Sequence, residues 1–179
     1  MNKLITTLIC FFIFVNISFS QNIWELGGEY QHPFGKGVSD NTLGLRYEGF
    51  KNKSSWSFGI TYTLPGKGES ENKGGFGFYG GYRYGFSYSG NANGNGGNGF
   101  VGFRASFNFN GYEHGNKKGN DATITPTVET GYQFIFSTHG FFTPGIGYGY
   151  SIKLNQDNDA PKNDEGSRFI PTVGIGYRF

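Results

Sequence analysis

The sequence predicts an all-β protein: an eight-stranded, antiparallel, up-and-down transmembrane β-barrel, preceded by a cleaved signal peptide. Apolar and polar side chains alternate at period two in eight segments, and long polar connections alternate with short turns between them. One parity of the segments carries nearly all of the aromatic rings, whereas the other carries the charges and most glycines. Such a two-faced sheet is typical of a wall between lipid and water.

Residues 1–20 are predicted to be a secretory signal peptide. Lys3 provides its positive charge, and an apolar run covers residues 4–15. This run is shorter than the ~20 residues that a membrane-spanning helix needs, and Ser20 provides a small residue at the expected cleavage point. The remaining residues, 21–179, then form one barrel domain.

Eight strands are predicted from the alternation. They cover approximately residues 23–32, 42–50, 55–64, 75–89, 100–109, 122–136, 141–154 and 168–179. Most have the ~9–11 residues of a tilted spanning strand, and we expect the three longer ones to project beyond the membrane.

The connections between the strands are of two kinds. Long, polar connections are predicted at residues 33–41, 65–74, 110–121 and 155–167, and tight turns at residues 51–54 and 137–140. With the amino-terminus in the periplasm, the long connections would face the outside of the cell. The Gly/Asn tract from Gly90 to Asn98 departs from this pattern, because a short turn is expected there.

The volume of the side chains decides which parity faces inward. The interior of an eight-stranded barrel is only wide enough for side chains to fill it, so the bulky aromatic parity must face outward. A soluble lipocalin-like barrel would need the reverse arrangement. The charged residues predicted to share the lumen are Glu25, Glu29, Arg46, Glu48, Arg83, Arg104, Glu129, Lys153, Arg168 and Arg178.

The carboxy-terminal strand ends with a polar residue, a glycine and two aromatic residues at fixed spacing: Thr172, Gly174, Tyr177 and Phe179. With this ending and the barrel pattern over residues 21–179, the chain resembles the small outer-membrane β-barrel family of Gram-negative bacteria. That family includes OmpX-like proteins, the transmembrane domain of OmpA and the opacity-type surface proteins. The resemblance implies that these four residues form an assembly signal read by the barrel-assembly machinery.

The resemblance also implies an integral outer-membrane protein, and we expect it not to be an enzyme. We expect a monomer with a structural role in the envelope, or a surface-interaction role through the long loops. Its partners would be outer-membrane lipid, lipopolysaccharide and an unidentified surface ligand. A formal net charge of only +2, without a basic run, gives no reason to expect nucleic acid. The only cysteine, Cys10, lies in the predicted signal peptide, so no disulfide is expected.

Two alternatives remain open. Six basic and four acidic residues on the lumen parity would suit a narrow, slightly anion-preferring, water-filled pore. A lipid A-modifying enzyme would need a serine, a histidine and a carboxylate at the outer rim, and His32, Ser39 and Asp40 lie there. The charged interior offers no pocket for an acyl chain, however, and we therefore predict no catalytic residue.

No metal or cofactor site is predicted either. Asn155, Asp157 and Asp159 have the spacing that opens a calcium-binding loop. The sixth and twelfth positions of such a loop need Gly and Glu, but the chain has Ala160 and Gly166.

Overall fold

The computed structural model describes residues 23–35, 38–66, 71–90, 95–114, 117–137, 139–154 and 165–179. The predicted signal peptide lies outside the described residues. Ten strands form within them: β1 (Ile23–Gln31), β2 (Phe34–Gly35), β3 (Val38–Ser39), β4 (Thr42–Lys51), β5 (Ser54–Thr63), β6 (Glu71–Gly90), β7 (Gly96–His114), β8 (Lys117–Phe136), β9 (Gly140–Lys153) and β10 (Gly166–Arg178). Among these residues, no helix is long and apolar enough to cross a membrane.

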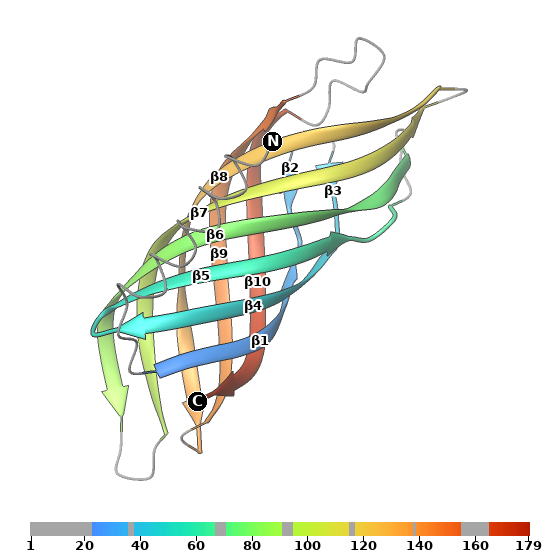
Figure 1. The fold of residues 1–179 in the computed structure, drawn as a ribbon. Helices are drawn as coiled ribbons and strands as arrows, with labels where there is room; N and C mark the ends of the chain where they lie inside the picture. The colour runs from blue at the N-terminus through green and yellow to red at the C-terminus, as the bar shows by residue number, and fades with distance from the viewer. Residues whose placement is uncertain are drawn as a thin grey trace, which may run out of the picture.

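Eight of these strands close into a barrel. They pair in the order β1-β4-β5-β6-β7-β8-β9-β10, each antiparallel to the next, and β10 pairs back to β1. The short β2 and β3 form a hairpin that attaches to β10 through the pair Phe34 and Phe169 (Figure 1). The predicted fold, an eight-stranded, antiparallel, up-and-down barrel, is confirmed.

The two ends of the barrel differ. At one end, here called the turn end, Asn52 and Ser137 adopt positive φ angles of 56° and 50° in the tight connections that the sequence predicts. Both chain ends of the barrel lie there, since Trp24 and Phe179 exchange backbone hydrogen bonds. At the opposite end, here called the hairpin end, β7 and β8 project beyond the other strands (Figure 1).

The prediction of a loop over residues 110–121 is wrong. Pairing between β7 and β8 continues from Asn110 opposite Asp121 to His114 opposite Lys117, so this region is a strand hairpin. Residues 110–121 are almost all polar or glycine, so the apolar alternation that marks a strand is missing there although the pairing continues. The connection predicted from Gly90 to Asn98 is likewise shorter than expected, because strand pairing continues to Gly90 opposite Gly96.

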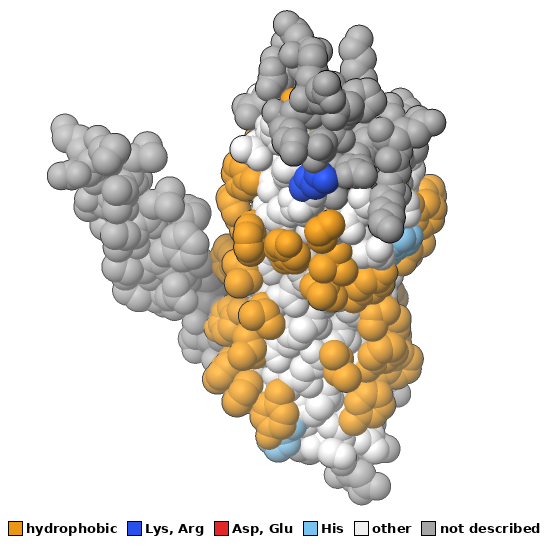
Figure 2. All heavy atoms as spheres, turned by 90° about the vertical axis from the view of Figure 1, so that its right-hand side faces the viewer, with side chains coloured by type: hydrophobic (Ala, Val, Ile, Leu, Met, Phe, Trp, Pro, Cys, Tyr) orange, Lys and Arg blue, Asp and Glu red, His pale blue; other side chains and the backbone are white. Residues whose placement is uncertain are grey.

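The outer wall of the barrel is apolar. Large side chains on the predicted outward parity are exposed, among them Leu45, Phe58, Ile60, Phe76 and Val128. Figure 2 shows such side chains spread along the wall between the two ends. Neighbouring rings stack across strands, as Phe78 and Phe107 do with ring centres 5.1 Å apart. The predicted orientation of the two parities therefore matches the structure.

Candidate functional site in the barrel lumen

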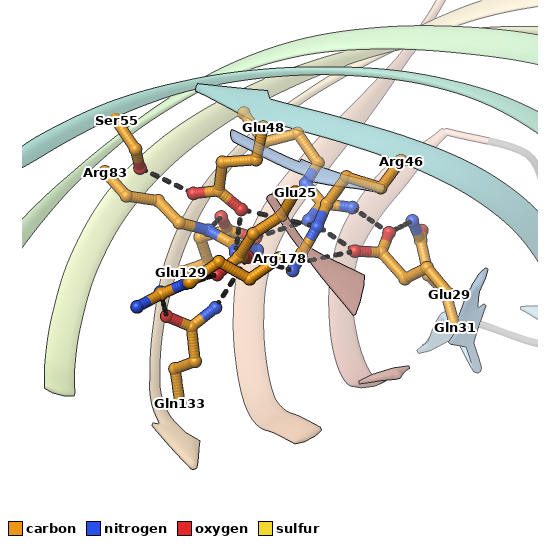
Figure 3. Close-up of polar contacts among 11 residues, drawn as sticks. Glu25, Glu29, Gln31, Arg46, Glu48, Ser55, Arg83, Glu129, Gln133 and Arg178 are labelled. Atoms are coloured by element: carbon orange, nitrogen blue, oxygen red, sulfur yellow. Dashed lines mark hydrogen bonds and ion pairs between the residues drawn. The ribbon is translucent and has the colours of Figure 1, made fainter. Parts of the chain in front are cut away.

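Ion pairs fill the middle of the lumen, and Arg46 of β4 lies at their centre. Its guanidinium group is buried, and its nitrogens lie 3.8 Å from Glu25, 3.6 Å from Glu29 and 3.3 Å from Glu48 (Figure 3). These residues share a level of the barrel because β1 pairs with β4 in a register that places Gly27 opposite Arg46. Gly174 of β10 leaves space beside the guanidinium group, since a Cβ atom there would lie 3.6 Å from Nη1 of Arg46.

Two further arginines link the remaining carboxylates. Arg83 of β6 lies 3.0 Å from Glu48 and 2.6 Å from Glu129. Arg104 of β7 donates hydrogen bonds of 2.5 and 3.1 Å to both oxygens of Glu29 and lies 3.0 Å from Glu129. Each of these carboxylates therefore contacts at least two arginines.

Arg178 closes the group at the turn end. Its Nη2 donates a 2.6 Å hydrogen bond to Glu25 and a 3.0 Å bond to the amide oxygen of Gln133. Gln133 in turn donates to Glu25 at 2.9 Å. We call the eight ionised residues the lumen network: Glu25, Glu29, Arg46, Glu48, Arg83, Arg104, Glu129 and Arg178.

The lumen network is electrically neutral, with four arginines and four glutamates. Ionised groups are costly to remove from water unless they are paired, and every member of the network lies within 3.8 Å of an opposite charge. A neutral, cross-linked cluster gives no preference for anions. The charge excess on which the pore alternative depended is therefore absent from the middle of the lumen.

The other two predicted lumen residues lie nearer the hairpin end. Lys153 at the end of β9 forms an ion pair of 3.0 Å with Asp121, a residue that the sequence assigned to a loop. Arg168 of β10 donates hydrogen bonds to the backbone carbonyls of Gly35 and Ser167, at 2.9 and 3.2 Å. Arg168 thereby anchors the β2–β3 hairpin over the rim.

Aromatic rings on the lumen parity were missed by the sequence analysis. Tyr79, Phe100 and Phe141 are buried, and each ring faces an arginine of the lumen network. The pairs, with distances from guanidinium carbon to ring centre, are Arg104 and Tyr79 at 4.1 Å, Arg83 and Phe100 at 4.4 Å, and Arg46 and Phe141 at 5.3 Å. Cation–π attraction adds to the ion pairs at these distances.

Glycines on neighbouring strands make room for these rings. A Cβ atom at Gly59 would collide with the ring of Tyr79, and one at Gly27 would lie 2.6 Å from Cζ of Phe141. Gly176, which faces Gly27 across the β1–β10 pairing, meets the same ring. The sequence does contain a signal for these rings: they are large, apolar residues at lumen positions, where the other residues are small or charged.

Small cavities lie on either side of the lumen network. One of about 80 Å³, here called the hairpin-end cavity, is lined mainly by hydroxyl and amide side chains. Another of about 20 Å³ lies at the turn end beside Arg83 and Gln133, and the two share no lining residue. The network therefore divides the lumen between them.

The histidine and serine of the enzyme alternative do come together. Nε2 of His32 lies 3.4 Å from Oγ of Ser39, and its Nδ1 lies 3.0 Å from Oδ1 of Asn41. The backbone N–H of Asp40 donates to the carbonyl of Pro33. The Ser39 contact is longer than the 2.5–3.0 Å of most hydroxyl hydrogen bonds. These bonds join the end of β1 to the strands that follow it.

The chain's other two histidines lie elsewhere in the barrel. His139 lies at the turn end and stacks on Tyr177, with ring centres 5.1 Å apart. His114 ends β7, and the residues of the incomplete calcium motif at 155–160 lie outside the described residues. Within the described ranges, no group of three or more His, Cys, Asp or Glu is arranged to hold a metal ion.

Solved structures share the fold at low sequence identity. The N-terminal β-barrel domain of OprF from Pseudomonas aeruginosa aligns over 89% of this chain and 98% of its own, with a TM-score of 0.65 and 12% identity. Neisserial surface protein A aligns over 87% of this chain and 94% of its own, with a TM-score of 0.58 and 13% identity. No protein-family model and no curated protein matches the sequence significantly. The likeness confirms the barrel fold that the resemblance implied.

Proposed function

We propose that this protein is an integral outer-membrane β-barrel with a non-enzymatic role in envelope structure or surface interaction. The proposal rests on one observation: the barrel has an exposed apolar outer wall around a buried, neutral cluster of ion pairs, which is the reverse of a soluble barrel. Soluble monomers rarely expose continuous apolar patches beyond a few hundred Å². In hydrocarbon the same wall is favourable, and closure of β10 on β1 satisfies the backbone groups that lipid cannot.

The direction of insertion follows from the two ends of the barrel. We expect the hairpin end, where β7 and β8 project and the long connections lie, to face the outside of the cell. The turn end then faces the periplasm, as in other outer-membrane barrels. Surface interaction would depend on the hairpin end, with lipid and lipopolysaccharide around a monomeric barrel.

Cysteine labelling tests both location and direction. The mature chain is predicted to have no cysteine, so single Asn120→Cys and Lys51→Cys variants, at exposed positions of opposite ends, form a matched pair. On intact cells a membrane-impermeant maleimide should label Asn120→Cys, whereas Lys51→Cys should react only after the outer membrane is permeabilised. Labelling of Lys51→Cys alone on intact cells would reverse the orientation. Recovery of the unmodified protein in the soluble fraction would reject the membrane location.

A narrow pore is the second candidate function, and the lumen network argues against it. The network separates the two lumen cavities, and no excess charge favours one ion. The refolded mature protein should therefore give no discrete conductance steps in a planar bilayer. Regular steps from a sample that is fully folded by its gel mobility would establish the pore instead.

The carboxy-terminal Phe179 packs against the barrel and is also predicted to be part of an assembly signal, and an experiment can distinguish these two roles. Phe179 stacks on Trp24, with ring centres 3.9 Å apart, and its N–H donates to the carbonyl of Trp24 at 2.8 Å. We expect Phe179→Ala to lower the amount of protein in the outer membrane several-fold while purified protein refolds in detergent almost as well as wild type. An equal loss in both measurements would mean that Phe179 acts only through packing.

A further inference from the structure

The hairpin-end cavity contains buried acceptor oxygens that lack donors. Asp121 is only 4% exposed, and its Oδ2 has no hydrogen-bond partner among the described residues. Oδ1 of Asn110, directly opposite Asp121 in the β7–β8 pairing, is also buried without a partner in the described part of the chain. Both residues line the cavity. Unpaired buried acceptors cost free energy, so this arrangement favours a ligand that donates hydrogen bonds.

The cavity is shaped by its own strands. A Cβ atom at Gly75 would collide with the side chain of Asn110, and one at Gly77 with the side chains of Asn108 and Thr61. Because Gly75 and Gly77 of β6 have no side chains, they leave room for the side-chain amides of Asn108 and Asn110. Hydroxyl groups continue the polar lining on the opposite side, where Oγ1 of Thr125 and Oγ of Ser151 lie 2.9 Å apart.

The charges around Asp121 select the kind of donor. Nζ of Lys153 lies 3.0 Å from Oδ1 of Asp121 and 6.0 Å from the ring centre of Tyr112. An added ammonium group or metal ion would be repelled by this lysine, since like charges a few ångströms apart interact unfavourably. A neutral hydroxyl group avoids this repulsion: it can donate to the free oxygen of Asp121 and accept from the hydroxyl and amide groups that line the cavity. Sugar hydroxyls have both abilities.

From this chemistry we propose that the hairpin-end cavity binds the terminal residue of a neutral saccharide. A volume of about 80 Å³ holds several water molecules, each needing roughly 10–15 Å³. The hydroxyl edge of one sugar ring can replace these waters, whereas an oligosaccharide would extend beyond the rim. The inference rests on the proposed surface role, because a glycan reaches the cavity only if the hairpin end faces outward.

Nuclear magnetic resonance on the ¹⁵N-labelled chain tests this binding. The protein is refolded in a phosphocholine detergent, since maltoside and glucoside detergents carry the proposed ligand, and is titrated with methyl glycosides of glucose, galactose and mannose. At least one should shift the side-chain amide resonances of Asn108 and Asn110. Asp121→Asn should weaken the affinity about tenfold, as expected for loss of a charge-assisted hydrogen bond. Lys51→Ala, at the turn end, should leave it unchanged.

A second experiment, in lipid nanodiscs, distinguishes between two possible sources of the sugar. If added lipopolysaccharide produces the same shifts, the ligand comes from the surrounding membrane; if only soluble glycosides do, it comes from another surface. Absence of shifts with every saccharide, in a sample whose spectrum shows a folded barrel, would overturn the proposal. Shifts produced by ethanolamine or Ca²⁺ instead, or unchanged sugar affinity in Asp121→Asn, would do the same. Because the labelling experiment on cells is independent, failure here leaves the proposed membrane location standing.

Discussion

Replacing Arg104 with methionine should destabilise the folded barrel by about 3–5 kcal/mol, the usual cost of leaving buried charges without their partner. Arg104 is buried and binds Glu29 at 2.5 Å and Glu129 at 3.0 Å. Methionine fills a similar volume over the ring of Tyr79 but compensates neither carboxylate. The measurement is the urea midpoint of the refolded protein in detergent, followed by tryptophan fluorescence.

Two controls separate charge from packing in this experiment. The double variant Arg104→Met with Glu29→Gln restores neutrality and should recover at least half of the loss, because the introduced amide oxygen can still accept the hydrogen bond that Gln31 donates to Glu29. Lys51→Met removes an exposed charge and should change stability by no more than about 0.5 kcal/mol. Wild-type stability of Arg104→Met alone would show that the lumen network contributes little.

The strands β1, β4 and β5 were predicted from sequence to within one residue at each end. The outward face of each of these strands is apolar and the inward face lines a packed lumen, so the alternation is clear. Each strand also ends at a proline or a tight turn. The side on which a residue lies follows from parity alone, so the charged residues could be assigned to the lumen from the sequence.

The partners within the lumen could not be predicted in this way. Parity gives the side of a residue but not its level, which depends on the stagger between strands around the whole barrel. Arg104 and Glu29 are 75 positions apart and meet only through that stagger. The aromatic lumen residues escaped for a related reason: a ring such as Phe141 fits inside only because Gly27 and Gly176 reach the same level on neighbouring strands.

Gly27→Val should prevent barrel closure, whereas Gly28→Val on the same strand should be tolerated. Gly27 faces the lumen opposite Gly176 in the pairing of β1 with β10. A Cβ atom there would lie 2.6 Å from the carbonyl oxygen of Ile175 and 2.6 Å from Cζ of Phe141. A Cβ atom at Gly28 points outward and meets nothing within 4 Å. The two substitutions therefore lie next to each other on β1, but only the one at Gly27 introduces a clash.

The loss at Gly27 should exceed the ~1–3 kcal/mol of ordinary overpacking, because part of the clash is with backbone at the closing pair of strands. Relief requires β1 to move away from β10, which leaves unpaired N–H and C=O groups in hydrocarbon at several kcal/mol each. The fraction of refolded protein with the faster gel mobility of an unheated, folded barrel measures closure. Phe141→Leu added to Gly27→Val should restore closure only partly, since the carbonyl of Ile175 stays in place. Full rescue would assign the clash to the ring alone, and equal folding of Gly27→Val and Gly28→Val would contradict the closely packed seam.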